Sequence, residues 1–188
     1  GNVYVGDAAK ERQALYPDTV AVSFKRSMGT DREYRLGQRK FRAEELSSLV
    51  LRSLKEDAEA FLGEPVTEAV ISVPAYFDDR RRKATKLAGE LAGLKVERIV
   101  SEPTAAAVAY GLYERRENTR FLVFDLGGGT FDVSILELYD QILEVRAVAG
   151  DNYLGGEDFT EALMKLFCQK TDWKAEKFSR QDRIRLFG

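Results

Sequence analysis

The stretch from Phe121 to Leu136, FLVFDLGGGTFDVSIL, decides the fold of this chain. A mostly apolar run leads into Asp125, three glycines follow, and apolar residues then alternate with other residues up to Leu136. Alternation with a period of two is typical of a strand, and a cluster of glycines is typical of a turn. The stretch therefore predicts a β-hairpin that carries an acidic residue at its tip.

The turn Gly127–Gly129 has the composition of a phosphate-binding turn. Glycine lacks a Cβ, so the backbone can take positive φ and can lie directly against a ligand. Consecutive backbone N–H groups in such a turn can converge on an anion, for which phosphate is the natural occupant. Asp125 and Asp132 flank the turn, and their carboxylates suit the Mg²⁺ that accompanies a nucleotide. A glycine turn between two strands is also common without any ligand, so both interpretations stay open at this point.

Composition and charge exclude several classes of protein. The chain has 188 residues, 44% of them hydrophobic and 32% charged, which is typical of a soluble globular protein with a real core. Its 29 basic and 31 acidic residues are interspersed and leave a formal net charge of −2. We therefore expect no nucleic-acid partner and no membrane partner, and we expect no signal peptide.

The chain has a single cysteine, Cys168, and no histidine. One cysteine cannot form an internal disulfide, which fits a reducing, cytoplasmic compartment, and we expect Cys168 to pack on a helix face. Nucleophile systems and metal sites that contain histidine are excluded. Any chemistry must use carboxylates, lysine, threonine, the backbone and a hard metal ion.

Alternating strands and helices between residues 43 and 112 predict an α/β layer. Apolar residues recur at helical spacing in three segments, and two short apolar runs separate them. We expect Asp79 to cap the second helix, Pro74 to end the first strand, and Pro103 to lie in the first turn of the third helix. The expected helices are 43–62, 80–92 and 104–112, and the expected strands are 69–73 and 96–100.

Three further elements are predicted outside this layer. A strand over 142–149 would follow the glycine hairpin and complete an antiparallel meander, and a short strand is expected over 3–5. The segment GDNYLGGEDF then places Gly155 and Gly156 ahead of a helix over 159–169. The free N–H groups of that helix start suit an anion or a nucleotide. A simple loop with Asp158 as the helix cap is the alternative.

Several nucleotide-binding motifs are absent from the sequence. G-x-x-x-x-G-K-[ST] does not occur, and no G-x-G-x-x-G follows a strand and opens a helix. A P-loop and a nicotinamide-binding fingerprint are therefore excluded.

Four stretches together resemble one family, the 70-kilodalton heat-shock chaperones of the DnaK type. They are VISVPAYFDDRRRKAT at 70–85, SEPTAAAVAYG at 101–111, FDLGGGTFDVSIL at 124–136 and GDNYLGGEDF at 150–159. The resemblance is to the ATPase domain and covers about residues 1–167, and helix 43–62 resembles the HscC branch. It implies an α/β, actin-like ATPase (ribonuclease-H-like) fold with two lobes around a nucleotide cleft.

The resemblance also implies how the chain divides. Residues 1–41 would form a peripheral subdomain of the first lobe and 42–115 the core of that lobe. Residues 116–158 would form the core of the second lobe with the phosphate-binding hairpin, and 159–188 the start of its upper part. The family's first phosphate loop would precede this chain, so the two-lobed domain is expected to be incomplete.

The resemblance assigns roles to residues at matching positions. ATP or ADP and Mg²⁺ are the implied cofactors, and Lys25, Glu102, Asp125 and Thr130 are the implied catalytic residues. Lys25 would point at the γ-phosphate and Glu102 would orient the attacking water. The implied nucleotide contacts are Gly127, Gly128, Gly129, Thr130, Gly155 and Gly156, and the implied metal ligands are Asp125 and Asp132.

Pro74 and Arg82 match the family's relay between nucleotide state and the peptide-binding domain. Pro74 as a strand terminator fits equally well, and from the residues alone a solvated helix position is favoured for Arg82. Ser101 stands where the family usually has Asn.

The function implied by the resemblance is that of an ATP-hydrolysing chaperone in protein folding and the stress response. Unfolded client peptides would bind through a peptide-binding domain outside this chain, and a J-domain co-chaperone and a nucleotide-exchange factor would be partners. These 188 residues alone are expected to hydrolyse ATP negligibly. Two alternatives share the fold superfamily, a sugar or acetate kinase and an actin-like scaffold protein, although SEPTAAAVAYG and VPAYF argue against the kinase.

Overall fold

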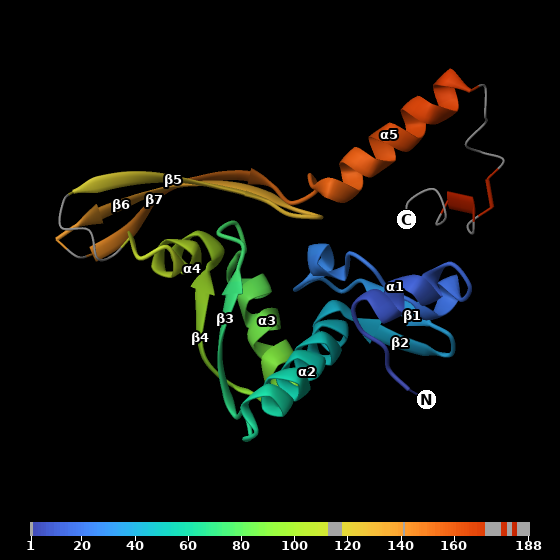
Figure 1. Cartoon of the computed structure of the whole chain (residues 1–188), viewed down its shortest axis with the longest axis horizontal. Helices are drawn as coiled ribbons and strands as arrows, with labels where there is room; N and C mark the ends of the chain where they lie inside the picture. Colours follow the sequence, from blue (N-terminus) through green and yellow to red (C-terminus); the bar gives the residue numbers. More distant parts are fainter. Residues whose placement is uncertain (1, 113–117, 141, 172–177, 180–181, 184–188) are drawn as a thin grey trace.

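A computed structural model of the chain describes residues 2–112, 118–140, 142–171, 178–179 and 182–183. Figure 1 shows two parts, one above the other. The lower part holds helices α1–α4 and strands β1–β4, and the upper part holds the sheet β5–β7 and helix α5. The chain is therefore α/β, as predicted, with its sheets in separate pieces.

Helix α2, Ala43–Leu62, has the predicted bounds. At its start the Arg42 backbone N–H donates to the Glu45 carboxylate at 2.6 Å, which satisfies an otherwise free donor. At its end Gly63 adopts φ +74, a left-handed conformation that glycine takes without steric cost.

Strands β3, Glu68–Val73, and β4, Lys95–Ser101, pair in parallel and are joined by helix α3, Asp79–Leu91. This confirms the predicted strand–helix–strand order. The cap of α3 was predicted one residue too late, because the Asp78 carboxylate, and not that of Asp79, accepts from the Arg81 N–H at 2.9 Å.

Helix α4, Glu102–Ala109, begins earlier and is shorter than the predicted 104–112. Ser101 is its N-cap, with its Oγ accepting from the Thr104 N–H at 3.4 Å. Serine and asparagine serve about equally well at this position, so the departure at Ser101 leaves the helix start intact. Pro103 lies in the first turn, as predicted.

The N-terminal region consists of α1, Asp7–Gln13, two short 3₁₀ helices, η1 Pro17–Thr19 and η2 Phe24–Ser27, and the hairpin of β1, Glu33–Leu36, and β2, Arg39–Arg42. The predicted strand over 3–5 is wrong, since these residues pair with no strand in the described part of the chain. The Arg12 guanidinium instead lies over the Tyr4 ring, 4.5 Å from the ring centroid. Phe24 of η2 packs against a core of six buried residues: Met28, Ala43, Val73, Phe77, Ala84 and Ala88.

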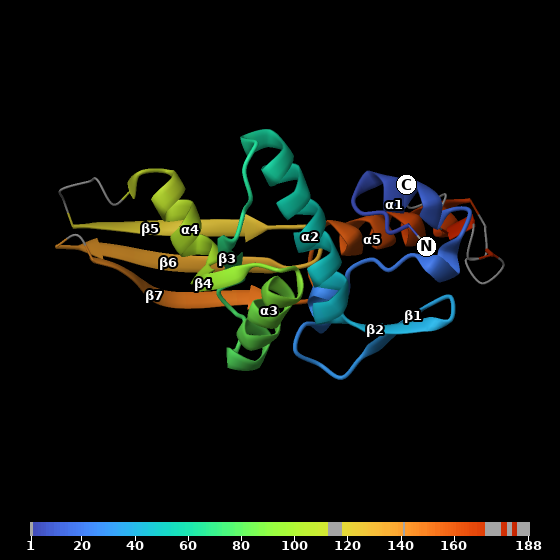
Figure 2. The same cartoon turned by 90° about the horizontal axis from the view of Figure 1, so that it is seen from below.

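The upper sheet is the predicted antiparallel meander, in the order β5-β6-β7. Its strands are β5, Thr119–Leu126, β6, Phe131–Tyr139, and β7, Ile142–Asp151. Every second residue of β6 from Asp132 to Leu138 is buried. Figure 2 shows the sheet along the long axis of the molecule, with α4 lying against β5 and β6.

Helix α5, Gly156–Lys170, leaves the end of the sheet at which the glycine turn lies (Figure 1). It begins three residues before the predicted start at 159, and Gly155, not Asp158, occupies the N-cap position. Cys168 is buried on it, as predicted.

Two findings concern the chain as a whole. No described helix combines the length and the apolar character that a membrane span requires. Residues 113–117 and most of the segment after Lys170 lie outside the described residues. The boundaries 1–41, 42–115, 116–158 and 159–188 stay predictions.

Candidate active site

The turn between β5 and β6 is closed by the Gly127 N–H, which donates to the Thr130 carbonyl at 3.0 Å. The positive φ that glycine permits is not used here, because Gly127, Gly128 and Gly129 all lie outside the positive-φ region. A Cβ on Gly128 would meet no atom within 4 Å, so open space adjoins the middle of the turn. The glycines are therefore not required by the backbone angles of the turn. Their lack of a side chain leaves the turn accessible to a ligand.

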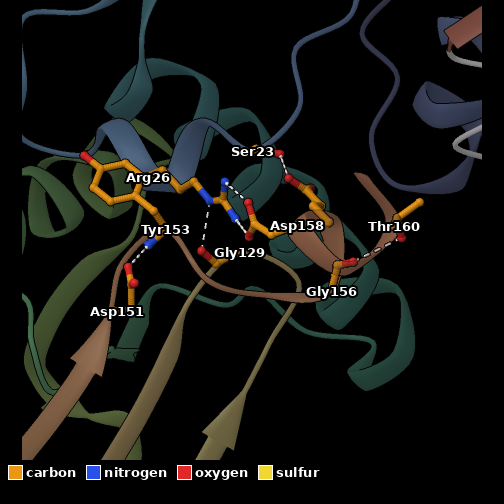
Figure 3. Close-up of polar contacts among 9 residues, drawn as sticks. Ser23, Arg26, Gly129, Asp151, Tyr153, Gly156, Asp158 and Thr160 are labelled. Atoms are coloured by element: carbon orange, nitrogen blue, oxygen red, sulfur yellow. Dashed lines mark hydrogen bonds and ion pairs between the residues drawn. The ribbon is translucent and has the colours of Figure 1, made fainter. Parts of the chain in front are cut away.

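Three consecutive carbonyls of this turn accept hydrogen bonds from outside the hairpin. The N–H groups of Gly156 and Glu157 donate to the Gly127 and Gly128 oxygens at 3.0 and 2.9 Å. Arg26 Nε donates to the Gly129 oxygen at 2.9 Å (Figure 3). The turn is thus held from one side by the start of α5 and by η2.

This arrangement decides where the N–H groups of the turn point. In a trans peptide the N–H lies opposite the preceding C=O. The N–H groups of Gly128, Gly129 and Thr130 therefore project away from α5 and Arg26. Within the described residues none of the three donates to a protein acceptor. Three backbone donors with a shared direction and no protein partner are suited to an anion.

The predicted free N–H groups at the helix start were wrong for Gly156 and Glu157, since both donate to the turn. Gly155 has a different role. A Cβ at this position would lie 2.5 Å from the Gly128 carbonyl and the Gly129 nitrogen, closer than side chains approach backbone. Only glycine therefore allows the loop to lie against the turn, and direct nucleotide contact by Gly155 and Gly156 stays a prediction.

Asp125 and Asp132 are directly opposite each other across the β5–β6 ladder. Asp132 is buried, at 4% exposure, and its Oδ1 has no hydrogen-bond partner. Burial, and then the charge of Asp125, raise the pKa of Asp132, while the Tyr76 backbone and Lys25 act in the opposite direction. A buried, unpaired oxygen beside a second carboxylate is a costly arrangement that a bound cation would relieve.

These two carboxylates fit Mg²⁺. The ion prefers oxygen ligands, and it usually keeps several waters and binds through one or two carboxylates together with phosphate oxygens. The described residues contain no cluster of three or more side chains that would enclose a metal by themselves. Asp125 and Asp132 would therefore hold the ion jointly with water and a phosphate ligand.

Lys25 Nζ forms an ion pair with Glu102 Oε1 at 3.0 Å. Lys25 comes from η2 and Glu102 is the first residue of α4, so the pair joins segments that are far apart in sequence. The charge of Lys25 also acts on Asp132. The structure thus brings Lys25 and Glu102 to the end of the glycine hairpin at which Asp125 and Asp132 lie. Thr130 is the last residue of the turn at that end.

Pro74 and Arg82 meet at Phe77. Pro74 is buried at the end of β3, as a strand terminator should be, and its carbonyl accepts from the Phe77 N–H at 3.1 Å. Arg82 Nε donates to the Phe77 carbonyl at 2.9 Å and is half-buried, so the favoured solvated position was wrong. The same loop carries Tyr76, whose backbone acts to lower the pKa of Asp132. The relay role itself stays a prediction.

Sequence reasoning missed two features of the site: Arg26, which is the pairing partner of Asp158, and the Tyr76 backbone. Arg26 Nη2 lies 2.5 Å from Asp158 Oδ2, across 132 positions of sequence. No periodicity or motif marks such a contact. The one available signal was that Arg26 directly follows Lys25.

Comparison with known proteins places this chain in a family. The family described as Hsp70 protein matches residues 32–186. Over 186 residues, 99% of this chain, the chain is 50% identical to "Chaperone protein DnaK" of Thermotoga neapolitana and 49% identical to the proteins of that name from Thermotoga petrophila and Thermotoga maritima. The chain spans about 30% of the length of these curated relatives. The finer resemblance to the HscC branch stays a prediction. The extent of the family match, together with identity of this level over nearly the whole chain, shows that the chain belongs to the Hsp70 family.

Proposed function

We propose that the chain is the phosphate- and Mg²⁺-binding part of an ATP-hydrolysing molecular chaperone. The observation that carries the proposal is the glycine turn. Its carbonyls accept hydrogen bonds from the start of α5 and from Arg26. The N–H groups of Gly128, Gly129 and Thr130 have no acceptor among the described residues and can bind an anion. Two carboxylates and a lysine–glutamate pair lie at the same end of the sheet.

Each group has a role in phosphoryl transfer to water, which depends on positioning and charge stabilisation more than on covalent chemistry. The turn would bind phosphate oxygens, and Asp125 and Asp132 would hold Mg²⁺. Mg²⁺-ATP supplies the scissile phosphoanhydride bond and the counter-charge. Lys25, held by Glu102 at 3.0 Å, would stabilise negative charge on the transferred phosphate, and Glu102 would orient water.

The wider function belongs to the whole protein. We propose that ATP binding and hydrolysis control the capture of unfolded peptides by a further domain, with a J-domain co-chaperone and an exchange factor as partners, in the cytoplasm. The loop of Pro74, Phe77 and Arg82 supports a relay role, because it joins β3 to α3 and reaches Asp132 through Tyr76. These 188 residues by themselves are proposed to be nearly inactive.

The test is ATP turnover by the full-length protein with and without an unfolded peptide. We expect slow turnover that the peptide accelerates. Lys25→Ala and Thr130→Ala should each lower turnover by about 100-fold or more, because each removes a group aimed at developing charge. Lys40→Ala is the matched control, since Lys40 forms an exposed pair with Glu33 on the β1–β2 hairpin, and it should leave turnover unchanged.

The alternatives predict other outcomes. A sugar- or acetate-kinase-like protein would transfer phosphate to a small acceptor and ignore peptide. An actin-like scaffold would assemble with ATP and would also ignore peptide. Turnover that is indifferent to both peptide and Lys25 would therefore overturn the proposal.

A further inference from the structure

Arg26 joins three segments that are far apart in sequence. From η2, its Nε donates to the Gly129 carbonyl at 2.9 Å. Its Nη2 and Nη1 donate to the Asp158 carboxylate on α5 at 2.5 and 3.4 Å (Figure 3). The two side chains are 19% and 30% exposed. We call Arg26, Asp158 and the Gly129 carbonyl the Arg26 clamp.

We propose that Arg26 is a positioning residue for ATP hydrolysis, acting through the clamp on the glycine turn and on Lys25. The inference rests on the proposed function and extends it to residues that carry none of the chemistry themselves.

The first step concerns the turn. Gly129 O is one of the three carbonyls held from outside, and Arg26 alone holds it among the described contacts. The peptide that carries this oxygen also carries the Thr130 N–H, which points the opposite way. Fixing the oxygen therefore fixes the direction of the Thr130 donor. A Cβ on Gly129 would lie 3.1 Å from Arg26 Nε, so the guanidinium lies directly against the turn.

The second step concerns Lys25. Helix η2 is attached to the first turn of α5 on both sides of Lys25, because Arg26 binds Asp158 and the Ser23 hydroxyl donates to the Glu157 carboxylate. Met28, 3% exposed, anchors the other side of η2 in the core. The Lys25 backbone is thus held between fixed points, which places its side chain at Glu102.

The third step concerns charge. Arg26 holds the pKa of Asp158 below its usual range, chiefly through the side-chain hydrogen bond, so the clamp is an ionised pair at neutral pH. Its donors are directed at protein acceptors and not at the open side of the turn. Arginine is required, because its planar fork spans a carbonyl and a carboxylate together and an ammonium group does not.

Two other roles for Arg26 make different predictions. If Arg26 acted only as a positive charge that attracts phosphate, Arg26→Lys would keep the normal rate of ATP hydrolysis. Asp158→Asn, which releases Arg26 from its ion pair, would not lower that rate either. If the clamp only stabilised the fold, the folded fraction of each variant would hydrolyse ATP at the normal rate.

The experiment uses the full-length protein with Arg26→Lys, Arg26→Gln, Asp158→Asn and the double variant Arg26→Gln/Asp158→Asn. Arg120→Gln is the matched control, since Arg120 pairs with Glu137 at 2.8 Å across the same sheet, away from the turn. The measurements are the single-turnover hydrolysis rate at saturating ATP, ADP affinity by calorimetry, and the folded fraction by thermal unfolding.

We expect each single variant, including Arg26→Lys, to lower the hydrolysis rate of folded protein by about 10- to 100-fold, the scale of a misplaced reacting group. The double variant should lose no more than the worse single variant, because the two residues act as one unit. The control should keep its rate within about twofold. ADP affinity should fall by a smaller factor than the rate.

Three results would overturn the inference: rescue by Arg26→Lys, an unchanged rate in Asp158→Asn, or a loss explained by the unfolded fraction alone. Failure of the proposed function is distinguishable, because turnover by the unaltered protein would then be absent, or indifferent to both peptide and Lys25→Ala. In that case amide hydrogen exchange at Gly127, Gly156 and Glu157, whose N–H groups donate to the carbonyls of the turn, still decides. The clamp predicts exchange faster by about tenfold or more in Arg26→Lys, and unchanged exchange would refute it.

Discussion

Two hairpins of the molecule, β1–β2 and β5–β6, turn on glycine for different physical reasons. In the β1–β2 hairpin Gly37 adopts φ +61, and a Cβ there would meet nothing within 4 Å. In the β5–β6 hairpin Gly127, Gly128 and Gly129 have no positive φ. Gly155, from the neighbouring loop, lies so close to that turn that a Cβ would be 2.5 Å from its backbone. Gly37 serves its own backbone conformation, whereas Gly155 allows a separate part of the chain to lie against the turn.

The hairpins also differ in what holds them. Across β1–β2, Lys40 and Glu33 form an exposed ion pair, a kind of contact that contributes little to stability. The β5–β6 turn is held by two backbone donors of α5 and by Arg26, and the nearby Asp132 is buried with an unpaired oxygen. The second turn is thus held rigidly around groups that lack a protein partner, which is how a binding site differs from a connection.

The largest expected effect is that of Gly155→Ala. Its Cβ would press on the backbone of Gly128 and Gly129, which cannot swing aside as a side chain can. We expect a loss of about 3 kcal/mol in the free energy of unfolding together with loss of nucleotide binding. Denaturant unfolding and ADP calorimetry would measure both, and a variant of normal stability and affinity would show that the loop does not need this close approach.

An intermediate effect is expected from Gly128→Ala, with Gly37→Ala as its counterpart. At Gly128 a methyl group enters open space without backbone strain, so stability should change by less than about 0.5 kcal/mol. The methyl group would occupy room that a phosphate needs, and ADP affinity should fall by about 5- to 100-fold.

At Gly37 the expected pattern is reversed. The left-handed φ should cost Gly37→Ala about 1 kcal/mol of stability, and nucleotide affinity should be unchanged. If both variants lost stability and neither lost affinity, the contrast between the two turns would fail.

The smallest expected effect is that of Asp132→Asn in metal-free protein. The folded-state pKa of Asp132 is raised, so folded protein binds this proton more tightly than unfolded protein does. Stability from this group is therefore present at acid pH and is lost as pH rises from the usual Asp pKa through the raised value. Asp132→Asn should remove this dependence and raise the neutral-pH melting temperature by about 2–4 °C.

The readout is a series of melting curves over pH without and with Mg²⁺. Mg²⁺ should stabilise the unaltered protein and not Asp132→Asn. A lower melting temperature for the variant throughout would mean that the Asp132 carboxylate is satisfied in the folded state.

Local features were predictable from sequence. Helix α2 has the predicted bounds because its apolar spacing and Gly63 are local signals. The strand order of the meander followed from one glycine turn and alternation on both sides. The start of α5 was misplaced because its first N–H groups bond to the Gly127 and Gly128 carbonyls, a stabilisation that no local cap reveals. The strand over 3–5 failed because a strand needs a partner that short alternation cannot supply.

The sequence by itself determined the elements, the acidic hairpin tip, the exclusion of histidine chemistry and a family resemblance, since periodicity, turn residues and composition act within a few positions of chain. The tertiary structure decided which groups meet. It tied the turn to α5 and Arg26, set Asp132 opposite Asp125 with one oxygen unpaired, and brought Lys25 to Glu102. Those contacts join residues up to 103 positions apart. Their geometry depends on how whole elements pack, because hydrogen-bond direction and burial are properties of three-dimensional surroundings and not of neighbouring residues in the chain.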